Sequence, residues 1–385
     1  MEPLVDEFPV VRVAARVLSH PGHVLGWWID PDHYSRAHER ATRLALARRI
    51  ASLKGFTYAG ELGSCILPPG PHYFVPSDTI LDVELATSMG IRSQHDLFGG
   101  VVPFPYAATK AISHGLIAPD AKAPQAWVAS LAPALAGTVL PGWTAFSLPD
   151  ARRAGRELLK AGRVRVKAVR ATGGRGQAVV SDPVSLDAAL DELPTLATDG
   201  VVLERNLCAP RTLSVGQATV GEVRIAYYGL QRLARNHSGE LVYGGSDLTV
   251  VRGDLDALCA MPLEAPLRLA IDQARRYHAA VTASFPGFLA SRINYDVAQG
   301  RDDAGQWHSG VLEQSWRVGG ASGAEIAAME AFREQPERAL VRASCVEVYG
   351  DVDLPPGATV YFSDIDPAVG RLTKFSFVEP HADAT

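Results

Sequence analysis

The stretch RVRVKAVRATGGRGQAVV, residues 163–180, places a glycine-rich loop between two runs of alternating small apolar residues. Alternation with a period of two is typical of β-strands, so the stretch predicts two antiparallel strands joined by a loop. Lys167 lies inside the first run, which favours a largely buried position for its side chain. Because glycine has no Cβ, backbone N–H groups in such a loop can approach anionic oxygens and cover the phosphates of a ligand.

The same loop excludes two familiar phosphate-binding motifs. No Gly-Lys-Ser/Thr follows the glycines, and the next expected element is a strand rather than a helix, which excludes a Walker A loop and a Rossmann fingerprint. Thr172, Arg175 and Gln177 could add donors, and Lys167 could supply a point charge to an α- or β-phosphate. A plain hairpin closed by a glycine turn explains the loop alone equally well.

Composition narrows the class of protein. With 385 residues, 47% of them hydrophobic, 21% charged and a net charge of −5, the chain is typical of a globular protein of two or three domains. The charge favours no broad basic surface, so we expect no nucleic-acid partner. The four cysteines lie far apart and form no zinc motif, which favours free thiols in a reducing, cytoplasmic compartment. No apolar run approaches the roughly 18 residues of a membrane span, so we expect no membrane association.

A second set of polar residues alternates along two expected strands near the end of the chain. In SRINYDV (291–297) and VLEQSWRVGG (311–320), a period of two places three polar side chains of each strand on one face: Arg292, Asn294 and Asp296, and Glu313, Ser315 and Arg317. If the strands pair, Asp296 and Glu313 can face each other.

Two carboxylates so close repel each other unless a divalent cation lies between them. Mg²⁺ accepts such oxygens and completes its shell with nucleotide phosphates. Arg292 or Arg317 would then neutralise charge that develops during phosphoryl transfer. A surface hairpin whose charges are simply solvated is the alternative interpretation.

A third feature is the apolar run VVLERNL, residues 201–207. A strand that ends in Glu204 can serve as a hinge between two lobes, and the backbone beyond it could bind the edge of an adenine ring. An exposed strand end would give the same pattern.

Taken in order, these features resemble the ATP-grasp superfamily over roughly residues 107–325. The closest likeness is to uncharacterised bacterial proteins of that superfamily. Lys110 in ATKAISHGL is similar to the first nucleotide-contacting lysine, and Lys167 to the second. TGGRGQAVV looks like the flexible loop over the phosphates, VVLERNL like the adenine hinge and EQSWR like the metal-binding Glu-x-Asn motif.

The resemblance implies an α+β fold that grips ATP between antiparallel sheets. An α/β domain, residues 1–106, would precede the first lobe, residues 107–203, whose lid is 141–203. The second lobe, residues 204–345, would carry the metal site. Residues 346–385 would form a β-rich tail packed on that lobe.

The resemblance also implies a reaction and a set of site residues. A carboxylate attacks the γ-phosphate of ATP, and an amine or thiol then displaces phosphate from the acylphosphate. The expected cofactors are ATP and Mg²⁺, the expected partners are small-molecule acids, amines or thiols, and a homodimer is possible. The implied nucleotide-binding residues are Lys110, Lys167, Thr172, Gly173, Gly174, Arg175, Gly176, Glu204, Arg205, Asn206 and Leu207. The implied metal ligands are Asp296, Glu313 and Ser315, and the implied catalytic residues are Arg292, Arg317 and Arg235.

Three departures from the family pattern keep other functions open. Ser315 stands where the last metal ligand is usually Asn, and Arg211 where a ribose-binding Glu is common. Either Asn294 or Asp296 could be the first metal ligand; Asp296 is preferred because it is the carboxylate. A non-catalytic nucleotide-binding or regulatory protein, and a small-molecule kinase, are therefore the alternatives to a ligase.

Overall fold

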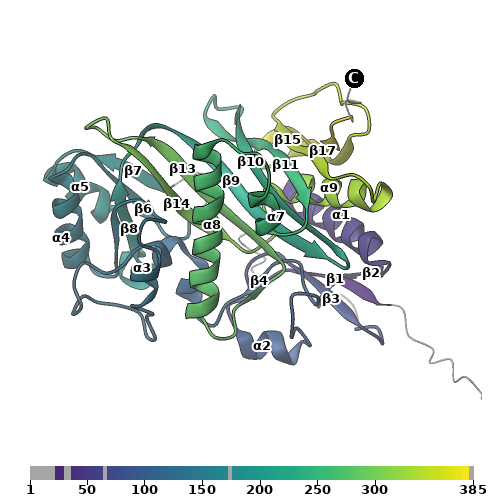
Figure 1. Cartoon of the computed structure of the whole chain (residues 1–385), viewed down its shortest axis with the longest axis horizontal. Coiled ribbons are helices and arrows are strands. Elements are labelled where there is room, and N and C mark those ends of the chain that lie inside the picture. Colours follow the sequence, from purple (N-terminus) through teal and green to yellow (C-terminus); the bar gives the residue numbers. More distant parts are fainter. Residues whose placement is uncertain (1–21, 30–35, 64–66, 172–175, 381–385) are drawn as a thin grey trace, which may run out of the picture.

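The computed structural model describes four segments, residues 22–29, 36–63, 67–171 and 176–380. The sequence FPVVRVAARVL, residues 8–18, predicts a short strand, which lies outside these segments. Three larger sheets are arranged along the molecule, with the β5–β8 sheet at one end and the N-terminal sheet and helix α1 near the other (Figure 1).

The N-terminal part is a three-stranded parallel sheet with helix α1 packed on it. Its order is β2-β1-β3, with β1 (His23–Trp27), β2 (Thr57–Glu61) and β3 (His72–Pro76). Helix α1 (Ala37–Lys54) ends at Gly55, which adopts the left-handed φ of 65° that favours glycine. In the sequence, alternating strand and helix signals predict a parallel-leaning sheet here, and residues 34–55 predict a helix closed by Gly55. The structure confirms both. Helix α2 (Val83–Ser88) follows, and β4 (Gly100–Val101) pairs with β12 (Leu289–Ala290).

The sequence ATKAISHGL, residues 108–116, predicts a helix. The structure has two 3-10 turns here instead, so that prediction is wrong. The turns are η1 (Pro105–Ala108) and η2 (Lys110–Ser113). Thr109 separates them because its backbone is extended, and its side chain accepts a hydrogen bond from the amide of Ala111. Such a local side-chain bond competes with helix formation. The short helix α3 (Leu131–Ala134) follows.

An antiparallel four-stranded sheet surrounds the glycine-rich loop. Its order is β5-β8-β6-β7, with β5 (Gly142–Ala145), β6 (Val164–Ala168), β7 (Gln177–Val180) and β8 (Val201–Arg205). The predicted strands on either side of the loop are β6 and β7, and their antiparallel pairing is confirmed. The helices of this part are α4 (Leu148–Leu159), α5 (Pro183–Asp191) and α6 (Leu196–Asp199).

The largest sheet has eight antiparallel strands in the order β14-β13-β9-β10-β11-β15-β17-β16. They are β9 (Cys208–Val220), β10 (Val223–Arg235), β11 (Leu241–Arg252), β13 (Arg292–Arg301), β14 (Trp307–Ser315), β15 (Leu340–Val348), β16 (Thr359–Asp366) and β17 (Gly370–Val378). The C-terminal strands are thus part of this sheet. The division of the chain at residues 106, 203 and 345 stays a prediction.

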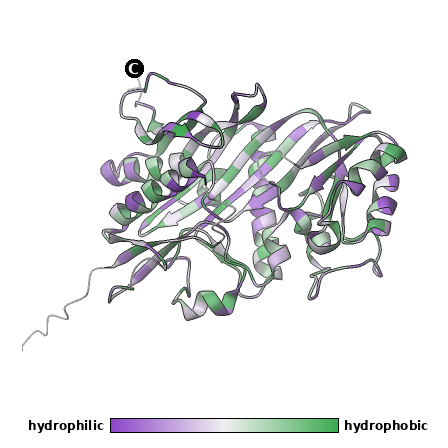
Figure 2. Ribbon diagram, turned by 180° about the vertical axis from the view of Figure 1, so that it is seen from behind, coloured by the Kyte–Doolittle hydropathy of each residue, from purple (hydrophilic) through white to green (hydrophobic). Residues whose placement is uncertain are grey.

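Helices cover both faces of the large sheet. Helix α8 (Ala265–Ser284) lies across one face beside α7 (Leu255–Cys259), and α9 (Ser322–Glu334) packs with α1 on the other (Figure 1). Neighbouring residues of β10 show the alternation: Ala226 belongs to the core under α8 and Tyr227 to the core under α9. From behind, the long strands show hydrophobic and hydrophilic residues interleaved (Figure 2). Among the described helices, none is both long and apolar enough to cross a membrane.

Candidate functional site

The two acidic residues predicted to face each other lie directly opposite on β13 and β14. The antiparallel register pairs Asp296 with Glu313 and Asn294 with Ser315. Residues paired in this way point to the same face of a sheet, so four oxygen-bearing side chains occupy one small area. The predicted pairing of Asp296 with Glu313 is confirmed.

The Asp296 carboxylate is held by three neutral donors. The hydroxyl of Ser214 donates at 2.9 Å, the amide of Asn294 at 3.0 Å and the amide of Gln231 at 3.0 Å. Burial, and then the nearby negative charge of Glu313, raise the pKa of the Asp296 carboxyl to about 6. A cation placed between the two carboxylates would relieve this repulsion and favour the ionised form.

Lys110 already places a positive charge at the second carboxylate. Its ammonium lies 2.8 Å from Oε2 of Glu313, and it also donates to the carbonyl of Ala171. Lys110 is buried, whereas the Glu313 side chain is 30% exposed. The lysine therefore joins the end of the β6 segment to the acidic pair on β13 and β14.

Lys167 and Glu204, both expected at the nucleotide, form a second cluster with His114. The Lys167 ammonium pairs with Oε1 of Glu204, and Nε2 of His114 lies 3.3 Å from Oε2 of the same carboxylate. All three side chains are buried. Burial opposes ionisation, but the charge of Lys167 and the hydrogen bond from His114 prevail and lower the pKa of the Glu204 carboxyl. Both oxygens of Glu204 thus have protein partners.

The side chains of the three hinge residues after Glu204 also contact other parts of the protein. Arg205 donates to the carboxylate of Asp302 at 3.0 Å, Asn206 accepts from Arg165 at 2.8 Å, and Leu207 is buried. Asp302 belongs to the β13–β14 turn, so that hairpin is tied to the hinge. The backbone amides of Arg205 and Asn206 also donate within the protein, to the carbonyls of Pro141 and Arg163. Contacts between the three hinge residues and an adenine ring stay a prediction.

The described residues include only the ends of the glycine-rich loop. Thr172, Gly173, Gly174 and Arg175 lie outside the described residues. Gly176 has a positive φ of 62°, and its carbonyl accepts a hydrogen bond from the amide of Ala168 at 2.9 Å. It therefore continues the β6–β7 hairpin.

Arg292, expected to neutralise charge during the reaction, has its own buried partner. Its guanidinium bonds to Glu325 on α9 at 2.7 Å and to the Ser315 hydroxyl at 3.2 Å, and the arginine is 1% exposed. The ion pair outweighs burial and raises the pKa of Arg292. Glu325 was missed from the sequence, although a single acid inside the apolar run AEIAAM is a signal for a buried partner. The charge of Arg292 is thus balanced by Glu325 within the protein, and its catalytic role stays a prediction.

The other two predicted catalytic arginines lie in different places. Arg317 lies 3.5 Å from Asp78, a residue of the N-terminal part, just beyond Ser315 in the chain. Arg235 donates to the carbonyl of Gly239 in its own hairpin turn. It is four residues beyond Gln231 on β10, roughly 13 Å along a strand. The structure therefore does not bring Arg235 to the acidic pair, and its catalytic role stays a prediction.

The chemistry of the acidic pair fits one divalent cation that shares its shell with phosphates. Within the described residues, no three His, Cys, Asp or Glu side chains gather as a complete metal centre. Mg²⁺ needs no such cage, because it commonly takes one or two carboxylates and completes its octahedron with waters and phosphate oxygens. Asp296 and Glu313 supply the two carboxylates, and the bound ammonium of Lys110 shows that Glu313 accepts a cation.

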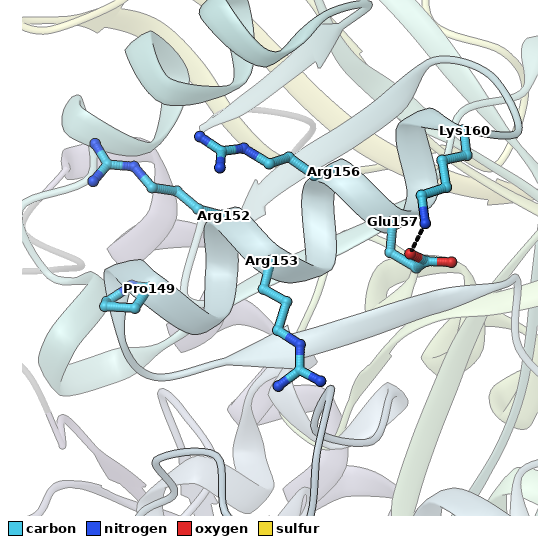
Figure 3. A pocket seen from close by; sticks show the side chains of 6 residues that line it. All are labelled: Pro149, Arg152, Arg153, Arg156, Glu157 and Lys160. Atoms are coloured by element: carbon cyan, nitrogen blue, oxygen red, sulfur yellow. Dashed lines mark hydrogen bonds and ion pairs between the residues drawn. The ribbon is translucent and has the colours of Figure 1, made fainter.

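A hollow of about 540 Å³ lies elsewhere, against the outer face of α4. Figure 3 shows its lining, which comes from one helical segment: Pro149, Arg152, Arg153, Arg156, Glu157 and Lys160. None of the predicted site residues lines it, and Glu157 pairs with Lys160 within it. It is a depression on the surface of one helix and plays no part in the candidate site.

Comparison with known proteins supports the fold. The chain resembles N5-carboxyaminoimidazole synthetase from Staphylococcus aureus, solved with ADP, at a TM-score of 0.54 and 10% identity, over 94% of each chain. Biotin carboxylase from Campylobacter jejuni matches at 0.47 and 12% identity, over 92% of this chain and 81% of that one. D-alanyl-alanine synthetase A from Vibrio cholerae matches at 0.45 and 12%, over 82% and 94%.

The first of these likenesses shows that the chain has the α+β ATP-grasp fold, as the sequence predicted. No curated protein matches the sequence itself. One family model matches residues 29–376, and the chain therefore belongs to the family described as "Protein of unknown function (DUF3182)".

Proposed function

We propose that the chain is an ATP- and Mg²⁺-dependent ligase that joins a small-molecule carboxylate to an amine or thiol. The observation that carries the proposal is the acidic pair Asp296–Glu313 with the ammonium of Lys110 at one of its carboxylates. When both bind, the triphosphate can pair with the Lys110 ammonium and the divalent cation with the two carboxylates, so no charge is left unpaired. The ATP-grasp fold supports the same interpretation.

The proposed reaction has two steps, phosphorylation of the acid and displacement of phosphate. A carboxylate oxygen of the acid attacks the γ-phosphorus of ATP, the bond from that phosphorus to the β–γ bridging oxygen breaks, and ADP leaves. The nitrogen or sulfur of the second substrate then attacks the acyl carbon and loses a proton, and phosphate leaves. The protein contributes mainly orientation and neutralisation of charge.

The chain's own residues divide this work. Lys110 would leave Glu313 for a phosphate oxygen, and Lys167 would contact a second phosphate. Asp296 and Glu313 would then hold Mg²⁺, which would supply neutralisation of phosphate charge. Arg317, two residues beyond Ser315, would exchange its pairing with Asp78 for the carboxylate of an acid substrate and orient it.

The test begins with binding. Calorimetry should show that the folded protein binds ATP with Mg²⁺, and that Lys167→Ala abolishes or strongly weakens binding. Lys160→Ala is the matched control, because the Lys160 side chain is 70% exposed at the end of α4 and pairs with Glu157 on the same helix. Phosphate release should then appear with some acid and amine, or acid and thiol, of a substrate panel. Absence of ATP binding by folded protein would refute the proposal.

A non-catalytic nucleotide-binding protein is the second candidate. One observation favours it: the two neutral metal-ligand positions are already engaged. The Ser315 hydroxyl bonds to Arg292, and the Asn294 amide accepts from Tyr227 and donates to Asp296. This candidate predicts ATP binding with no phosphate release from any acid and amine or thiol.

A further inference from the structure

His114 is packed into a space that a glycine provides. Gly142 of β5 lies opposite Glu204 of β8. A Cβ on Gly142 would lie 2.8 Å from Cε1 of the His114 ring and 2.8 Å from the Leu203 carbonyl oxygen. The imidazole therefore lies against the bare backbone of Gly142. That position brings Nε2 to 3.3 Å from the Glu204 carboxylate.

The carboxylate between His114 and Lys167 has no access to solvent. Glu204 is 1% exposed, and each of its oxygens has one of these two side chains as its charged or polar partner. A buried carboxylate that loses its partners is strongly destabilised. If Lys167 turns toward a phosphate, His114 is the partner that Glu204 retains.

One short turn connects this cluster to the acidic pair. Lys110 begins η2 and reaches Glu313, and His114 is the residue that ends the same turn and reaches Glu204. The η2 turn therefore contacts both the acidic pair, through Lys110, and the Glu204 carboxylate that holds Lys167, through His114.

We propose that His114 is a positioning residue for nucleotide binding, an inference that rests on the proposed function. It anchors Glu204 in its buried position, and through Glu204 it fixes the direction of the Lys167 ammonium. It also keeps the carboxylate paired when that ammonium moves to the phosphates. His114 touches no nucleotide itself, so its effect falls on the phosphates rather than on the base.

Two substitutions at this position form a matched pair. In His114→Gln the side-chain amide nitrogen reaches about as far as Nε2 and can still donate to Glu204. In His114→Asn the amide is shorter and cannot reach. Calorimetry with ADP and Mg²⁺, and with pyrophosphate and Mg²⁺, should show Gln within about threefold of the unchanged protein. Asn should weaken both ligands by about tenfold or more, as expected for a lost hydrogen bond to a charged group.

Three outcomes would overturn the inference: affinity unchanged in His114→Asn, no rescue by Gln, or a loss seen for ADP and not for pyrophosphate. Circular dichroism checks the fold. If the Asn variant does not fold, His114→Phe, which keeps the ring and removes the donor, is expected to weaken both ligands equally. If the unchanged protein binds no ADP, the proposed function fails and takes this inference with it. If the unchanged protein binds ADP and the His114 variants bind it equally well, only this inference fails.

Discussion

The ammonium of Lys110 lies 2.8 Å from the carboxylate of Glu313, so a turn early in the chain and a strand near its end meet at one charge pair. Glu313 in turn faces Asp296 across the β13–β14 ladder. This places one cation and two anions within a single small area. A triphosphate would replace Glu313 as the anionic partner of Lys110, and a divalent cation would replace Lys110 as the cationic partner of Glu313.

The first prediction concerns Glu313. Glu313→Gln should weaken ADP binding in the presence of Mg²⁺ by about tenfold or more, because the carboxylate that shares the cation is lost. Binding of ADP in EDTA should be unchanged or tighter, because Lys110 no longer has a competing acid. Calorimetry in the two buffers measures both. Glu157→Gln on α4 is the control, and an equal loss in both buffers would contradict the assignment of Glu313 to the metal.

The second prediction follows from the raised pKa of Asp296, about 6. Between about pH 4 and 6 the folded protein retains a proton that the unfolded chain has lost, so this group's contribution to stability falls as pH rises and is constant above pH 6. Asp296→Asn should therefore stabilise the protein at pH 7.5, by up to about 3 kcal/mol for a shift of about two units. The gain should shrink toward pH 4.5. Urea unfolding at both pH values measures it.

The same ionisation predicts the reverse trend for binding. A carboxylate must be deprotonated to hold Mg²⁺, so ADP binding with Mg²⁺ should weaken as pH falls below 6. A variant that is less stable at both pH values, or binding that is flat across pH 6, would show that Asp296 does not titrate as described.

The third prediction concerns the pair of Arg292 and Glu325. Both side chains are almost fully buried and lie 2.7 Å apart. Glu325→Gln leaves the arginine without its counter-charge and should lower the free energy of unfolding by about 3 kcal/mol. Arg317→Ala, which breaks a partly exposed pair with Asp78, should lower it by about 1 kcal/mol or less. Equal effects in urea unfolding would argue against a buried, charged Arg292.

The strands of the site were predictable because alternation fixes which residues share a face. That reasoning places Asp296 opposite Glu313 and Lys167 on the strand before the glycine-rich loop, and the structure agrees. The roles of these residues depend on partners that come from other strands, however. Ser214 reaches Asp296 from β9, which pairs with β13, and Gln231 reaches it from β10, the next strand of the sheet.

The remaining partners left little trace in the local sequence. His114 reads as an ordinary residue of a short helix, because its contact depends on Gly142 of a distant strand. Asp302 and Asp303 read as a polar turn, yet they bind Arg205 and Arg163 beside the hinge. Long-range ion pairs of this kind follow from the assembled topology rather than from spacing along the chain.

The last prediction tests the space that Gly142 provides. Gly142→Ala would place a Cβ 2.8 Å from both the His114 ring and the Leu203 carbonyl, so one of them must move. We expect a loss of about 1–3 kcal/mol in the free energy of unfolding, the usual range for an overpacked site. ADP binding should also weaken, because the displaced ring no longer reaches Glu204. Gly26→Ala is the matched control in another strand, since its nearest neighbour would be the Tyr58 hydroxyl at an ordinary 3.6 Å. If Gly142→Ala binds ADP as tightly as Gly26→Ala does, the contact between His114 and Glu204 has no part in binding.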